Sequence, residues 1–106
     1  GGAGPPVQVG DLRLDPAARR VHRGDEEIVL RPKEFDLLAR LAAAAGSVVR
    51  REALMSDVWD SRWSGGTKTL DVHIAALRRR LDQAGRPSRI TTVRGVGYRL
   101  EAVRDL

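Results

Sequence analysis

The sequence of 106 residues contains no cysteine, few aromatic residues and no long apolar run. Without cysteine the chain forms no disulfide and no thiolate metal site, which suits a reducing, cytoplasmic setting. No apolar stretch approaches the roughly 18 residues of a membrane-spanning helix, and the first residues lack the pattern of a signal peptide. Aromatic residues make up only 4% of the chain, which leaves little material for platforms that stack unpaired RNA bases.

The motifs of common enzymes and metalloproteins are also missing. No Gly-rich phosphate loop of the Walker type occurs, and the Gly-Val-Gly at 95–97 lacks the spacing of a dinucleotide-binding fingerprint. His22 and His73, the two histidines, do not have metal-ligand spacing. We therefore expect no enzymatic activity, no cofactor and no bound metal.

Positive charge is present and is concentrated in one part of the chain. Residues 67–99 hold eight Lys or Arg against two Asp, whereas the rest holds 11 basic and 12 acidic residues. A polyanion is the natural partner for such an uneven distribution, although a merely solvated basic face is the simpler alternative. The 42% of apolar residues is enough for one modest core in a single small domain.

Short segments with strand alternation occupy the first third of the sequence. They lie at 12–14, 20–22 and 27–30, and Asp15-Pro16 and Gly24-Asp25 separate them as turns separate antiparallel strands. This pattern predicts a small N-terminal antiparallel sheet.

Two helices are predicted next. The first begins at Pro32, a residue suited to the first helical position, and ends at Gly46, which caps its C-terminus. After a short extended piece at 47–49, the second covers 51–60, and a loop follows at 60–66.

The third predicted helix, "TLDVHIAALRRRL", begins at Thr69 and ends near Gly85. One face carries Leu70, Ile74, Leu77 and Leu81, at spacings of four, three and four residues, and should face the core. The opposite face is small and flanked by cations, with Lys68, Val72, Ala75, Ala76 and Arg79.

The final segment, "ITTVRGVGYRL", alternates apolar and polar residues about Gly95 and Gly97, which predicts a β-hairpin. Three helices followed by a hairpin is the order of a winged helix-turn-helix. The expected fold is therefore α+β, with a small N-terminal sheet, three helices and a C-terminal hairpin that forms the wing.

Several of these segments resemble one known family. "RPKEFDLLARL", "VVRREALMSDVWD", "TKTLDVHIAALRRRL" and "ITTVRGVGYRL" are similar to the DNA-binding effector domain of OmpR/PhoB response regulators, over about residues 12–101. The resemblance implies a winged-helix DNA-binding domain at 11–103, after a linker or cloning remnant at 1–10 and before a tail at 104–106. It also implies transcription regulation in a two-component phosphorelay, with a receiver domain in the full-length protein.

Two features depart from the family pattern. Arg31 and Arg50 stand where family helices usually start after Ser or Thr, so a cap worth roughly 1 kcal/mol is missing at each start. These arginines either meet DNA phosphates or are solvated. Some relatives have Arg in place of Ala75 or Ala76, so their base preferences do not transfer.

The resemblance assigns roles on the third helix, which would enter the major groove. The apolar Val72 and Ala76 are expected to meet base edges, because apolar side chains can contact the thymine methyl group. Arg79 is expected to reach a phosphate or a base edge. Phosphate contacts are expected from Lys68, Thr69, His73 and Arg78.

Further contacts are expected from the hairpin. Arg94 precedes Gly95 and Gly97, which permit a tight tip and a close backbone approach, and an Arg at such a tip can enter a narrow minor groove. Thr92 and Tyr98 are candidates for donating to phosphates.

Several assignments have a simpler alternative. Val72 is then exposed by chance, His73 is a packing residue, and Tyr98 is a core ring with a wet hydroxyl. Trp59 is expected to be mostly buried, although the family pattern lets its indole N–H reach the DNA backbone. Asp71 either accepts from a cytosine amino group or is an ordinary charge at a helix start.

The loop between the second and third predicted helices corresponds to a segment that contacts RNA polymerase in some family members. Its candidate residues are Asp60, Ser61, Arg62, Trp63 and Ser64, and Trp63 folding back on its own domain is the alternative. The expected partners are thus double-stranded DNA, bound by self-associating copies on tandem direct repeats, and RNA polymerase. The alternative function is a winged helix used mainly for protein–protein contact. A DNA titration distinguishes this alternative from DNA binding.

Overall fold

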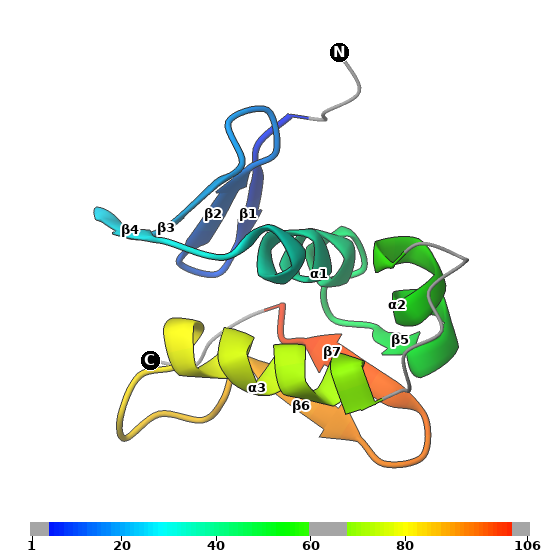
Figure 1. Cartoon of the computed structure of the whole chain (residues 1–106). Coiled ribbons are helices and arrows are strands. Elements are labelled where there is room, and N and C mark those ends of the chain that lie inside the picture. The colour runs from blue at the N-terminus through cyan, green and yellow to red at the C-terminus, as the bar shows by residue number, and fades with distance from the viewer. Residues whose placement is uncertain (1–4, 60–67, 103–106) are drawn as a thin grey trace.

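The computed structural model describes residues 5–59 and 68–102 (Figure 1). In chain order the elements are β1 (Val7–Val9), β2 (Leu12–Asp15), β3 (Arg20–Arg23), β4 (Glu26–Ile28), α1 (Pro32–Ala43), β5 (Val48–Arg50), α2 (Arg51–Val58), α3 (Lys68–Leu81), β6 (Ile90–Val93) and β7 (Gly97–Leu100). This confirms the expected α+β order of sheet, three helices and hairpin. None of the helices in the described ranges is long and apolar enough to span a membrane.

The first four strands form an antiparallel sheet in the order β1-β2-β3-β4. Alternate side chains face the core, so Leu12 and Val21 are almost fully buried. The expectation that residues 1–10 form an unpacked linker is wrong for Val7–Val9, which pair with β2. The side chain of Val9 is only 6% exposed, and three residues between Pro and Gly are too few to show a strand period in the sequence.

The helices bury the apolar stripes that their 3.6-residue period predicts. α1 packs against both α2 and α3, and Pro32 occupies the first turn of α1 as expected. The stripe residues of α1 and α3 are at most 4% exposed: Phe35, Leu38, Leu41, Leu70, Ile74, Leu77 and Leu81.

α3 ends at Leu81, earlier than the expected end near Gly85. The carboxylate of Asp82 accepts the backbone N–H of Arg89 at 2.9 Å, which turns the chain out of the helix. The guanidinium groups of Arg23 and Arg89 donate to the carbonyl oxygen of Leu81, at 2.8 and 3.2 Å. Long-range contacts therefore close this helix end.

The predicted hairpin, β6 and β7, pairs with a third strand. Together they form an antiparallel sheet in the order β5-β7-β6, with β7 in the middle. β7 lies so close to β5 that a Cβ atom on Gly97 would stand 2.0 Å from the carbonyl oxygen of Val49. The backbone N–H of Arg51, at the start of α2, donates to the carbonyl oxygen of Val96 at 3.0 Å. The wing (β6, β7 and the turn between them) is thus anchored to the helical core.

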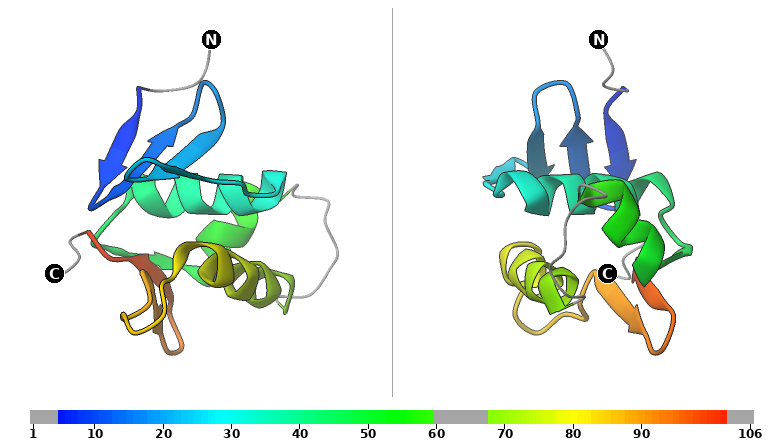
Figure 2. Two further views of the ribbon diagram at one scale, coloured as in Figure 1. Left: turned by 90° about the vertical axis from the view of Figure 1, so that its left-hand side faces the viewer. Right: turned by 45° about the vertical axis from the view of Figure 1, so that its right-hand side comes forward.

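α3 and the wing lie on the same side of α1, and the N-terminal sheet lies on the other side (Figures 1 and 2). The basic third of the sequence therefore forms one end of the molecule.

Candidate nucleic-acid interface

The outward face of α3 is open to solvent, as its periodicity predicts. The side chain of Val72 is 63% exposed, and Lys68, Ala75 and Arg79 are also exposed. This face combines small apolar side chains in the middle with cations at its ends.

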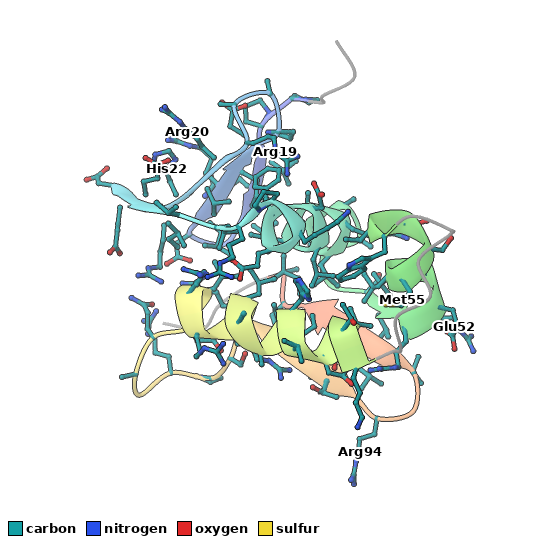
Figure 3. All side chains as sticks on the ribbon, in the orientation of Figure 1. Arg19, Arg20, His22, Glu52, Met55 and Arg94 are labelled. Atoms are coloured by element: carbon teal, nitrogen blue, oxygen red, sulfur yellow. The ribbon has the colours of Figure 1, made fainter. Side chains whose placement is uncertain are left out.

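Three of the side chains expected to contact DNA are cations without a partner in the described ranges. The side chains of Lys68, Arg79 and Arg94 make no hydrogen bond or ion pair to another residue in the described ranges. Arg94 stands in the turn between β6 and β7, and it points away from the ribbon (Figure 3). The next residue, Gly95, has a φ of 74°, and no atom lies close to the position that a Cβ would take there, so glycine serves the turn itself.

Arg78 is engaged within the protein instead. Its guanidinium donates to the carbonyl oxygen of Ile90 at 2.8 and 3.1 Å and to the hydroxyl of Thr92 at 2.7 Å. It also lies 5.8 Å from the ring centroid of Tyr98. These contacts link α3 to the wing, and the phosphate contact expected of this side chain stays a prediction.

Tyr98 belongs to a second link between α3 and the wing. Its ring is buried, and its hydroxyl donates to the carboxylate of Asp71. The guanidinium of Arg51 from α2 binds the same carboxylate with two hydrogen bonds, of 2.7 and 3.1 Å. Asp71 stands in the first turn of α3, as the helix-start alternative states, but its carboxylate is engaged by Arg51 and Tyr98. The ring of Tyr98 is buried, as the core-ring alternative states, but its hydroxyl binds Asp71.

The charges of this cluster reinforce one another. The hydrogen bonds from Arg51 lower the pKa of the Asp71 carboxyl, and the same contact raises the pKa of Arg51. Burial, and then the hydrogen bond to Asp71, raises the pKa of the Tyr98 hydroxyl, which keeps its proton.

His73 and Trp59 pack against each other where α3 meets the end of α2. Their ring centroids are 5.1 Å apart at an interplanar angle of 80°, and Trp59 is 7% exposed. The Nδ1 atom of His73 lies 2.8 Å from the carbonyl oxygen of Thr69, and because a carbonyl only accepts, Nδ1 donates this hydrogen bond. The packing alternative therefore describes where both side chains lie, and the DNA contacts expected of them stay predictions.

A hollow of about 290 Å³ opens between α3 and the start of α1. It is lined by Arg31, Glu34, Val72, His73, Ala76, Arg79 and Arg80. The Glu34 carboxylate, 3% exposed, forms an ion pair with the Nε of Arg80 and accepts the backbone N–H of Arg31, both at 2.8 Å. Glu34 thereby satisfies the backbone N–H of the N-cap residue, whereas the cap that a Ser or Thr side chain would make is missing.

Two other expectations concern loops and metals. The candidate polymerase-contact residues, Asp60, Ser61, Arg62, Trp63 and Ser64, lie outside the described residues.

Within the described ranges, no group of three or more His, Asp or Glu side chains is arranged to hold a metal ion.

An exposed helix with a small, cation-flanked face beside a basic wing defines the class of winged-helix DNA-binding domains. The protein family described as "Transcriptional regulatory protein, C terminal" matches residues 25–100. The chain belongs to this family, the C-terminal DNA-binding domains of OmpR/PhoB transcriptional regulators, which are not enzymes.

Relatives and solved structures agree with this assignment. BasR of Escherichia coli is 50% identical over 96 residues, which cover 89% of this chain and 40% of BasR. CseB of Streptomyces avermitilis is 40% identical over 93 residues, covering 88% of this chain and 38% of CseB. The chain thus spans about two fifths of the length of these curated relatives.

Among solved structures, the DNA-binding domain of Klebsiella pneumoniae RstA in complex with the RstA box has a TM-score of 0.82 and 36% identity, covering 93% of this chain and 99% of that one. The DNA-binding domain of Escherichia coli CpxR has a TM-score of 0.81 and 34% identity, covering 94% and 100%. These likenesses extend over whole domains.

Proposed function

We propose that this domain binds double-stranded DNA in a sequence-specific manner, as the effector part of a two-component response regulator. α3 lies in the major groove and reads bases with Val72 and Ala76, Arg79 reaches a phosphate or a base edge, and Arg94 enters the neighbouring minor groove. The observation that carries the proposal is the exposed apolar face of α3, with unpaired cations on the helix and on the adjacent wing.

The dimensions and chemistry of DNA suit this face. The major groove of B-DNA is about 12 Å wide and admits one α-helix, so residues in the middle of the reading face must be small. A valine that is 63% exposed gains little from its own fold, and the thymine methyl group gives it an apolar partner. Cations at the ends of the helix then meet phosphates.

The proposal also covers how the full-length protein assembles on DNA. Two copies bind tandem direct repeats head to tail, because the small interface of one winged domain gives limited specificity. A receiver domain in the full-length protein controls this self-association. The loop at 60–64 contacts RNA polymerase.

The first test compares two single substitutions on duplexes selected from a random pool. Arg94→Ala should weaken binding by roughly 1–3 kcal/mol and relax the preference at A·T-rich flanks, because a minor-groove contact depends on groove width. Lys68→Ala should weaken binding to all duplexes alike and reduce the salt slope by about one unit, because a phosphate contact carries no sequence information.

Titrations of each variant at several salt concentrations measure both quantities. Unchanged affinity and site preference in Arg94→Ala would show that the wing does not read DNA. A changed preference with an unaltered slope in Lys68→Ala would contradict the phosphate role of Lys68. A chain that binds no duplex would instead favour a protein–protein function.

A further inference from the structure

The two flanks of α3 contact different parts of the molecule. Asp71 and Arg78 lie on one flank and contact the wing. Arg80 lies on the other flank and pairs with Glu34 of α1. A duplex whose major groove holds α3 places one sugar–phosphate strand along each flank. The wing lies beside the first DNA strand, and the start of α1 lies beside the second DNA strand.

The hollow on the α1 flank has an excess of positive charge. Its single carboxylate, Glu34, is buried and already bonded to Arg80 and to the backbone N–H of Arg31. The guanidinium groups of Arg31 and Arg79 remain, and neither makes a hydrogen bond or ion pair to another described residue. Two unneutralised guanidinium groups in one hollow suit a phosphodiester, which accepts several hydrogen bonds from them.

The same hollow is continuous with the reading face of α3. Val72 and Ala76 line it together with the arginines. A ligand in this hollow therefore lies next to the residues that face the bases, where a backbone phosphate of the bound duplex must pass.

The residue at the start of α1 also breaks a local rule of helix formation. Arg31 is the N-cap of α1 and makes no side-chain cap hydrogen bond, although Ser or Thr there would accept a backbone N–H and stabilise the helix. Positions that violate a local structural rule are expected at functional sites.

From these observations we infer that Arg31, together with Arg79, binds a phosphodiester of the DNA strand that passes along the α1 flank of α3. This subsite rests on the proposed function, because it requires α3 to lie in the major groove. It adds a contact from outside the helix-turn-helix and the wing, and it fixes the position of the second strand.

The test uses Arg31→Gln, with Arg13→Gln as the matched control. Both arginines are exposed and unpaired within the described residues, and both substitutions remove one positive charge. Arg13 lies on β2 of the N-terminal sheet, on the far side of α1 from α3 (Figure 1). The probe is a duplex with one selected half-site, so that no second copy binds.

Losing one phosphate contact should make the salt slope shallower by about 0.9. Between 50 and 200 mM salt, the affinity of the unaltered chain should therefore fall about 3.5-fold more than that of Arg31→Gln. Arg13→Gln should keep the original slope. Thermal unfolding of both variants should match that of the unaltered chain, since neither side chain makes a hydrogen bond or ion pair to another described residue.

Methylphosphonate linkages, placed one at a time in the duplex, locate the contact. One linkage should weaken binding of the unaltered chain but have no further effect on Arg31→Gln. An unchanged slope in Arg31→Gln, or an equal change in Arg13→Gln, would overturn the subsite alone. No duplex binding by the unaltered chain would overturn the proposed function and the subsite with it.

Discussion

At the scale of single residues, the hydroxyl of Tyr98 links the wing to α3. It donates to Asp71, which Arg51 holds from α2. The lowered pKa of the Asp71 carboxyl stabilises the fold at any pH above the ordinary carboxyl value, and this contribution is lost as the pH falls through the lowered value. The link is therefore intact at neutral pH.

Tyr98→Phe should weaken this link while the ring stays buried. We expect the free energy of unfolding to fall by about 1 kcal/mol, the usual net value of one hydrogen bond. Because the wing is then less well fixed, Arg94→Ala should cost less DNA affinity in the Tyr98→Phe background than in the unaltered chain. Urea unfolding and a double-mutant cycle on the selected duplex measure the two effects. Strictly additive losses of affinity would show that Tyr98 does not position Arg94.

The sequence could not show which arginines are already engaged. Arg78 and Arg79 are neighbours of the same type on the same helix, yet Arg78 binds Ile90 and Thr92 while Arg79 has no partner in the described residues. A partner 12 or 14 positions away along the chain depends on the tertiary fold. Residue type and helical position alone therefore predicted a DNA contact for both, a phosphate for Arg78 and a phosphate or a base edge for Arg79.

At the scale of elements, Gly97 allows the wing to lie against β5. Gly97→Ala would place a Cβ 2.0 Å from the Val49 carbonyl oxygen and 2.9 Å from the Arg50 Cα, and both are backbone atoms that cannot rotate away. We expect this substitution to lower the free energy of unfolding by roughly 2–4 kcal/mol, since it forces two strands apart. Chemical denaturation measures the loss.

Gly24→Ala is the control for that substitution. Gly24 has a φ of 59° but open space around its Cβ position, so only the dihedral strain of about 1–2 kcal/mol applies. Equal losses in the two variants would mean that the approach of β7 to β5 is not what requires glycine at position 97.

Helices and strands could be predicted where the segment is long enough to show a repeating pattern of apolar residues. The 14 residues of α3 span several turns, so four buried positions identified its inner face. The three residues of β1 gave no such period, and the pairing of β5 with β7 joins segments about 50 positions apart. Turn glycines predicted a hairpin, but only the fold shows the third strand that anchors it.

At the scale of the whole molecule, the basic charge of residues 67–99 is partly neutralised within the fold. Four of its eight cations are committed to internal partners: Arg78 to Ile90 and Thr92, Arg80 to Glu34, Arg89 to Asp11, and Arg99 to Glu101. The other four, Lys68, Arg79, Arg86 and Arg94, are unpaired within the described residues, and Arg31 at the start of α1 adds a fifth unpaired cation beside α3. The charge available to DNA is thus smaller than the composition indicates.

This division predicts the salt dependence of DNA binding by one copy. The logarithm of affinity falls with the logarithm of salt concentration by about 0.9 per neutralised phosphate. These five cations of the described residues give a slope of about −4.5, whereas adding the four engaged arginines would make nine cations and a slope of about −8. Titrations of a single half-site from 50 to 200 mM salt measure the slope. A slope near −8 would mean that Arg78, Arg80, Arg89 and Arg99 exchange their internal partners for phosphates when DNA binds, and the contacts between α3 and the wing would then rearrange in the complex.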